Sequence, residues 1–201
     1  MRSGAADKRY SLAGSTMSVD YFGTFFTEAG FDFTGLINAD FFQPVRILFQ
    51  KQHYVSAVKL LVVAIDSIAF VEFGDGHSEN IFVKWLNTYA DMASLNITSE
   101  ELWEHRNSLL HMSNLDSRKV QSGKARRLVA YVGEIHPDVV LDETKTGYYN
   151  LQKLISAIGQ ACEKWCYTYG DNREKIHSFV ERYDLIASDA RMLRIDVDAK
   201  P

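Results

Sequence analysis

The spacing of apolar positions along the chain is mostly that of helices. Apolar side chains recur with the helical period over long segments that contain no proline or only one near a start. The period predicts helices over 40–52, 54–73, 78–92, 98–111, 149–169 and 172–186. Two short apolar runs, 128–132 and 139–141, predict a small β-hairpin. We therefore expect a mainly α fold, a bundle of four to six helices with a β-hairpin insertion after the fourth predicted segment.

The segment 54–73 is apolar on nearly every face, which predicts the central helix of the bundle. Its exception is Asp66, which directly follows the apolar run 60–65. A carboxylate in such a position needs a partner, because an unpaired charge is costly to bury. Two interpretations are open: Asp66 pairs with Arg106, or it pairs with Lys59 or with nearby backbone.

The helix that begins near Thr98 contains a cation at an unexpected place. Thr98 and Glu101 have the spacing of a capping box, and the apolar stripe that follows has Arg106 where an apolar residue would complete it. A guanidinium at a buried position must be paired or must face a wet cleft. Asn107 and His111, four residues apart, share a helix face close to it. These three side chains are the candidate site.

The run Arg106-Asn107-Ser108-Leu109-Leu110-His111 resembles the Arg-x4–6-His signature of the HEPN superfamily: an arginine, a polar residue after it and a histidine five positions on. The resemblance covers the motif at 106–111 and, by helix pattern, about 40–187. It implies a helical bundle. For many members it also implies a metal-independent endoribonuclease of toxin–antitoxin, phage-defence, CRISPR or RNA-processing systems.

RNA supplies its own nucleophile, the 2′-hydroxyl, so cleavage without a metal needs proton transfer and charge stabilisation. In that scheme His111 transfers the proton, Arg106 holds the scissile phosphate, and Asn107 orients His111 or donates to a phosphate oxygen. The products are a 2′,3′-cyclic phosphate and a 5′-hydroxyl. One histidine cannot be acid and base at once, and the chain has one copy of the motif, so the resemblance implies a homodimer through the motif face.

The formal net charge of -4 provides no global attraction for nucleic acid, so RNA would be bound by a local patch. We expect that patch after the motif, where cations are concentrated at Arg118, Lys119, Lys124, Arg126 and Arg127. The predicted substrate-binding residues are Arg118 and Lys119, together with Asp66 as the partner of the motif arginine.

The composition, 46% hydrophobic, is that of a folded protein, and we expect one domain over 19–190. Residues 1–18 are interpreted as a disordered tail or an expression remnant, and 191–201 as a frayed end. Cys162 and Cys166 fit reduced core packing.

With no signal peptide and no apolar run near the roughly 18 residues of a membrane span, we expect a cytoplasmic protein with no membrane contact. No cofactor and no metal is expected; RNA, a second copy, and an antitoxin or regulatory protein are the expected partners.

Three other interpretations stay open. The first is a catalytically silent HEPN-like module that binds RNA or a nucleotide. The second is a metal site, since Glu101 with His105 and Glu104 with His111 could face the bundle interior as ligands. The third is a plain helical scaffold or interaction protein, in which the motif arginine forms only a structural ion pair and His111 is an ordinary surface residue.

Overall fold

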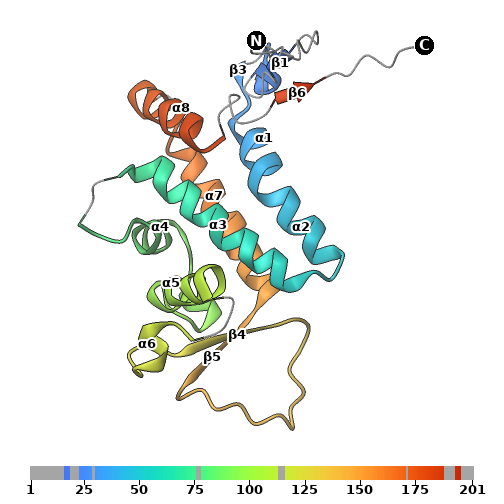
Figure 1. The fold of residues 1–201 in the computed structure, drawn as a ribbon, viewed down its shortest axis with the longest axis vertical. Coiled ribbons are helices and arrows are strands. Elements are labelled where there is room, and N and C mark those ends of the chain that lie inside the picture. The colour runs from blue at the N-terminus through green and yellow to red at the C-terminus, as the bar shows by residue number, and fades with distance from the viewer. Residues whose placement is uncertain are drawn as a thin grey trace, which may run out of the picture.

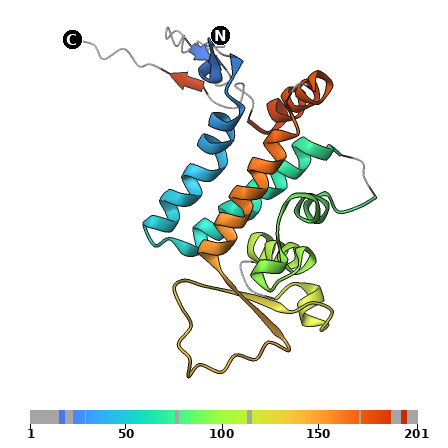
Figure 2. The same cartoon turned by 180° about the vertical axis from the view of Figure 1, so that it is seen from behind.

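The computed structural model describes residues 16–18, 23–28, 30–75, 78–112, 116–170, 172–187 and 193–195, and the described chain is mainly helical, as predicted. Long helices pack side by side in the body of the molecule, and a small pair of strands lies at one end (Figures 1 and 2). The other residues of the predicted tails, 1–15, 191–192 and 196–201, lie outside the described residues. Within the predicted tails, β1 (Thr16–Ser18) and β6 (Leu193–Ile195) are not frayed but pair antiparallel with each other.

The first helical segment starts earlier than the predicted residue 40. It comprises α1 (Phe33–Ile37), a π-helical turn (Asn38–Phe42) and α2 (Gln43–Gln50). The short elements before it are a 3-10 turn (Gly23–Phe25) and the antiparallel pair β2 (Phe26–Thr27) and β3 (Gly30–Phe31). Pro44 lies in the first turn of α2, just after the π turn ends. A proline lacks an amide proton and crowds the carbonyl of the preceding turn, and the wider π turn leaves room for it.

The central helix α3 (Tyr54–Phe73) has the predicted bounds. Within the described residues, α3 is the helix that is long and apolar enough to cross a membrane. Half of its apolar stretch is buried within the fold. It packs against α2, α4 and α8, with residues such as Leu61, Ile65 and Ile68 fully buried. The helix α3 is therefore the central core helix that the sequence predicts.

The next two helices differ from prediction at their ends. Helix α4 (Ile81–Tyr89) is shorter than 78–92, and its cap is Asn80 rather than Ser78, because the Asn80 side chain accepts from two backbone N–H groups of the first turn. A 3-10 turn (Ala93–Leu95) leads to α5 (Ser99–Asn107). The capping box of Thr98 and Glu101 is present, as predicted. Beyond Asn107 the helix continues as a π-helical turn (Ser108–Met112).

The predicted β-hairpin is wrong. After α6 (Arg118–Gln121), strand β4 (Arg127–Tyr131) pairs with β5 (Thr146–Asn150), and the two run parallel. Parallel strands need a long crossover, and the segment 132–145 provides it as a loop at the lower end of Figure 1. The apolar run 139–141 belongs to this loop, and Val140 is 95% exposed.

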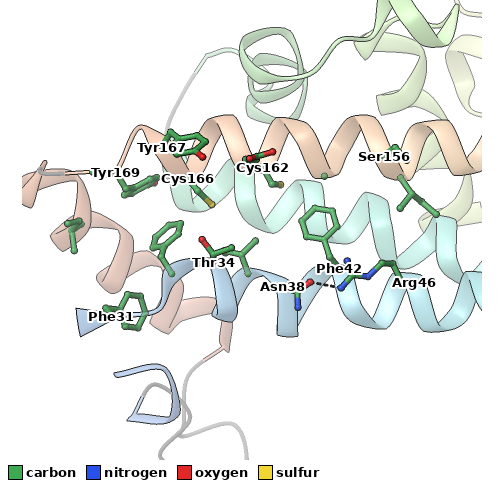
Figure 3. A pocket seen from close by; sticks show the side chains of 17 residues that line it. Phe31, Thr34, Asn38, Phe42, Arg46, Ser156, Cys162, Cys166, Tyr167 and Tyr169 are labelled. Atoms are coloured by element: carbon green, nitrogen blue, oxygen red, sulfur yellow. Dashed lines mark hydrogen bonds between the residues drawn. The ribbon is translucent and has the colours of Figure 1, made fainter. Parts of the chain in front are cut away.

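Helix α7 (Leu151–Tyr167) follows β5 directly, and a turn connects it to α8 (Arg173–Ala187). Aromatic rings fill the space between these helices and the start of α1: Phe33 lies 4.3 Å from Phe179 and 5.6 Å from Trp165, measured between ring centroids. Along its length α7 also runs beside the segment 33–50, and an apolar groove separates the two (Figure 3).

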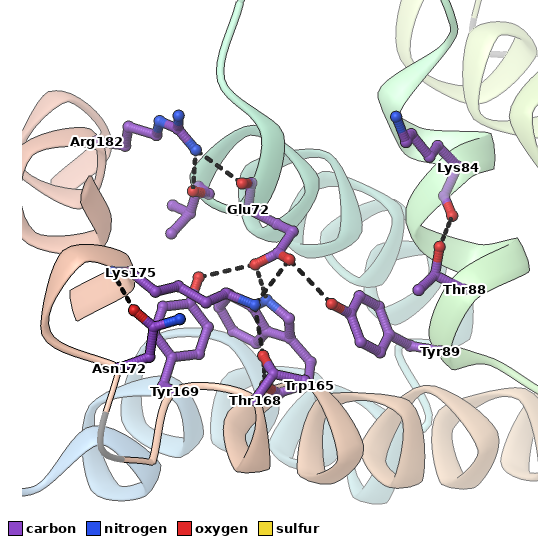
Figure 4. A network of polar contacts seen from close by, with 11 residues as sticks. Glu72, Lys84, Thr88, Tyr89, Trp165, Thr168, Tyr169, Asn172, Lys175 and Arg182 are labelled. Carbon is purple, nitrogen blue, oxygen red and sulfur yellow. Dashed lines mark hydrogen bonds and ion pairs between the residues drawn. The ribbon is translucent and has the colours of Figure 1, made fainter. Parts of the chain in front are cut away.

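Glu72 ties the end of α3 to three other helices (Figure 4). Its carboxylate accepts hydrogen bonds from Tyr89 (2.9 Å), Trp165 (2.8 Å), Tyr169 (2.9 Å) and Lys175 (2.8 Å). Burial by itself raises the pKa of Glu72, but these donors, Lys175 first, outweigh burial and bring the pKa below its usual value. The network fixes how α4, α7 and α8 pack around the central helix.

Candidate functional site

Arg106 lies in the last turn of α5, and its guanidinium contacts three polar side chains. Nε donates to Oδ2 of Asp66 at 2.7 Å, and Nη2 donates to the same oxygen. Nη1 donates to Oδ1 of Asn107 at 3.1 Å and lies 3.1 Å from Nε2 of His111. The predicted contact between Asp66 and Arg106 is confirmed, and the structure brings Asp66 and the three predicted catalytic side chains into one cluster.

The contact between Arg106 and His111 depends on the π-helical turn Ser108–Met112. In a regular α-helix, residues five apart point about 140° apart around the axis, given 3.6 residues per turn. A π turn closes i to i+5 hydrogen bonds and so places such residues on one side. Regular helical spacing groups His111 with Asn107, so the expected nearness of His111 to Arg106 becomes a direct contact through the π turn. No feature of the sequence indicates the π turn.

The cluster is half-buried. The side chains of Arg106 and Asp66 are 18% and 25% exposed, whereas His111 is exposed. The guanidinium also lies over the ring of Trp103, 4.9 Å from its centroid, a stacking contact worth about 0.5–2 kcal/mol. Burial raises the pKa of Asp66, and the hydrogen bond and charge of Arg106 offset only part of that rise.

Trp103 is an apolar residue of the same helix, three positions before Arg106, and the sequence analysis gave it no part in the site. The signal was present, because residues three apart on a helix are neighbours. The ring covers one face of the guanidinium and Asp66 occupies the Nε edge. The Nη1 edge, which faces Asn107 and His111, is the part best placed to meet an anion.

The predicted cationic patch is largely neutralised, which corrects the sequence interpretation. Of its five cations, three are paired: Lys119 with the buried Glu104 at 2.9 Å, Arg126 with Glu101 at 2.6 Å, and Arg127 with Asp116 at 2.6 Å. The helix α5 thus supplies two of the three carboxylates.

Arg118 is exposed on α6. Among the contacts of the described residues, none joins Arg118 or Lys119 to the Arg106 cluster. Lys119 instead shares Glu104 with Ser117, whose hydroxyl donates to the second carboxylate oxygen at 2.7 Å. The two predicted substrate-binding cations are therefore not part of the site core, and Lys119 serves to hold α6 against α5.

The residues of the metal interpretation have other partners. Glu101 is held by Arg126 and by the backbone of Thr98, and Glu104 by Lys119. His105 is buried, and its Nε2 lies 3.1 Å from the hydroxyl of Tyr149, while burial lowers its pKa to about 4. In the part of the chain that the structure describes, no three acidic, histidine or cysteine side chains form a group that could hold a metal ion.

Comparison of the chain with family models, with curated proteins and with solved structures gives no match in any of the three. The function is therefore argued from the geometry of the Arg106 cluster and from general chemistry.

Proposed function

We propose that this protein is a metal-independent endoribonuclease of the HEPN type, a helical bundle that acts as a homodimer. The observation that supports this proposal best is the contact between Arg106 Nη1 and His111 Nε2 at 3.1 Å, on a helix turn of unusual geometry. A permanent cation beside a histidine, which can accept and donate a proton, is the minimum set for cleaving RNA by its own 2′-hydroxyl.

On this proposal each side chain of the cluster has a distinct part. Asp66 holds the Nε edge of Arg106 and fixes the plane of the guanidinium. A phosphate oxygen that takes the Nη1 donors displaces His111 from them, which frees the Nε2 lone pair to accept the 2′-hydroxyl proton. The charge that builds on the phosphate is then stabilised by Arg106, and Asn107 is near enough to donate its amide protons to the same phosphate or to hold His111.

A dimer completes the reaction. After one imidazole takes the proton from the 2′-hydroxyl, a second group must protonate the departing 5′-oxygen. A two-fold axis beside His111 supplies that group from a second copy, and the exposure of His111 leaves it accessible. On this proposal the partners are RNA and a second copy, with an antitoxin or regulatory protein as a further partner, and the cytoplasm is the place of action.

The test is RNA cleavage by the purified chain in the presence of EDTA, with analysis of the product ends. The expected products carry 2′,3′-cyclic phosphate and 5′-hydroxyl ends. His111→Ala lowers the rate by about 10²–10⁴-fold if it transfers protons. The matched control is His177→Ala, since His177 is also an exposed helical histidine, paired with Glu181 on α8. Equal loss in both variants, or full activity in both, overturns the proposal.

A second candidate is a scaffold or silent binding module, and one observation favours it. Asp66 already neutralises Arg106, so an incoming anion must compete with a carboxylate that is bound through two nitrogens. In that case Arg106→Gln lowers stability, the unmodified protein shows no cleavage, and RNA affinity does not depend on residue 106. Measuring stability, cleavage and RNA binding on the same preparation separates the two functions.

A further inference from the structure

An apolar groove of about 820 Å³ lies between the helical segment 33–50 and α7 (Figure 3). Its size is within the range of about 300–1,000 Å³ that small-molecule sites occupy. None of the residues of the Arg106 cluster lines it. The inference that follows is thus independent of the proposed ribonuclease activity.

The two ends of the groove differ in chemistry. In Figure 3, Phe31 and Tyr169 lie at one end, and Phe33, which contacts both rings, also lines the groove. At the other end Arg46 donates from Nη2 to Oδ1 of Asn38 at 2.6 Å, opposite Ser156. Arg46 is exposed, whereas Tyr169 at the aromatic end is buried. The groove therefore has an apolar interior and a cationic mouth.

The wall between the two ends carries little charge. Cys162 and Cys166 both face the groove, and burial raises the pKa of Cys166 to about 12, so it is an uncharged thiol at neutral pH. The acidic lining residue Glu163 is seven positions from Ser156 along α7, about 10 Å at 1.5 Å per residue. An anionic group at Arg46 is thus well separated from the carboxylate of Glu163.

The middle of the groove is kept open by a glycine. Gly159 lies within α7, and a Cβ atom placed on it would meet nothing within 4 Å. Glycine is unfavourable inside a helix, and its φ angle here is not one that requires glycine. No packing contact explains it, but any larger side chain at this position would project into the groove.

We propose that this groove binds a fatty acid, with the carboxylate at Arg46 and the hydrocarbon chain along the aromatic and thiol-lined wall. The charge of Arg46 selects an anionic head group, and its exposure lets that head group remain at the mouth. The distribution of charge favours this occupant over an apolar helix of a second copy, which would leave Arg46 without an anion.

The test is calorimetric titration of the purified full chain with dodecanoate below its micelle concentration, beside the uncharged methyl ester. Gly159→Leu fills the middle of the groove, and Gly159→Ala is the matched control because it adds only one methyl group. We expect Gly159→Ala to bind dodecanoate like the unmodified protein. Gly159→Leu should bind it at least about 100-fold more weakly, because the added side chain occupies the space of the hydrocarbon chain. Thermal unfolding of both variants verifies that they fold.

Arg46→Gln tests the head group. It should weaken dodecanoate binding by about tenfold, which is typical of one lost charge-assisted contact, and leave binding of the ester unchanged. Absence of binding by the unmodified chain, or equal binding by Gly159→Leu, overturns the proposal. It is also overturned if Gly159→Leu converts a dimer to a monomer in light scattering, because the groove then belongs to a second copy.

Discussion

The ion pair between Asp66 and Arg106 gives the most direct test of the candidate site. Replacing Asp66 by asparagine keeps the shape of the side chain and removes its charge. Two guanidinium nitrogens then lose a charged acceptor, while the cation stays in a position that is 18% exposed. Such a change leaves a poorly solvated cation, which is the main cost of breaking a pair of this kind.

The magnitude lies between two limits. Removing one partner of a fully buried pair costs about 3–5 kcal/mol, and exposed pairs contribute about 0–1 kcal/mol. With the two side chains 18% and 25% exposed, we expect Asp66→Asn to lower the free energy of unfolding by about 2 kcal/mol. At a urea m-value of about 2–3 kcal/mol/M, the midpoint should fall by about 0.7–1 M.

The assay is urea unfolding, followed by circular dichroism, of Asp66→Asn, Arg106→Gln and the double variant. If the two residues act as a pair, the double variant is less destabilised than the sum of the single ones, and the coupling energy is on the order of 1–2 kcal/mol. Additive effects, within about 0.5 kcal/mol, would refute the ion pair as the reason that a guanidinium occupies this apolar stripe.

Three further changes test the rest of the fold. His105 is held neutral, because burial lowers its pKa to about 4. The free energy of unfolding should therefore decline by up to about 3 kcal/mol as pH falls from about 6.5 to 4. In urea unfolding at several pH values, His105→Gln should flatten that decline and the control His136→Gln should not. Glu72→Gln should cost about 2–4 kcal/mol at pH 7 by thermal or urea unfolding, and should reduce the loss of stability below pH 4.5, because the pKa of Glu72 is lowered in the folded state. Gly147→Ala should cost about 1–2 kcal/mol, since its new Cβ would lie 2.6 Å from a methyl group of the buried Leu128; an unchanged midpoint would contradict the packing of β4 on β5.

The sequence predicted the features that are determined locally. Apolar residues dominate α3 on nearly every face, and no proline or glycine falls inside it, so its bounds follow from the pattern. The capping box of Thr98 and Glu101 identifies the start of α5 because both partners are within one turn. The pairing of Asp66 with Arg106 was one of two interpretations open from the sequence, because Asp66 directly follows the apolar run 60–65 and Arg106 interrupts an apolar stripe.

Features that depend on distant partners were not predictable in this way. The donors to Glu72 come from residues as far along the chain as Tyr89 and Lys175, so nothing near Glu72 indicates them. The strand β5 pairs parallel to β4 across a long loop, and the apolar run nearest to β4 is in that loop. The cationic patch was overestimated because two of its three carboxylate partners, Glu101 and Glu104, lie on α5, before the motif.

The π-helical turn is the feature that distinguishes the two candidate functions. A structural ion pair needs only Asp66 and Arg106, which lie on α3 and α5 and would meet whether or not α5 stayed regular beyond Asn107. A π turn departs from the favourable helical geometry and is frequently found at functional sites. Here its consequence is specific, because it moves His111 from a different face of the helix to the Nη1 edge of Arg106. The proposed ribonuclease requires this contact, whereas a structural ion pair between Asp66 and Arg106 does not, so the turn is the observation on which the proposal depends.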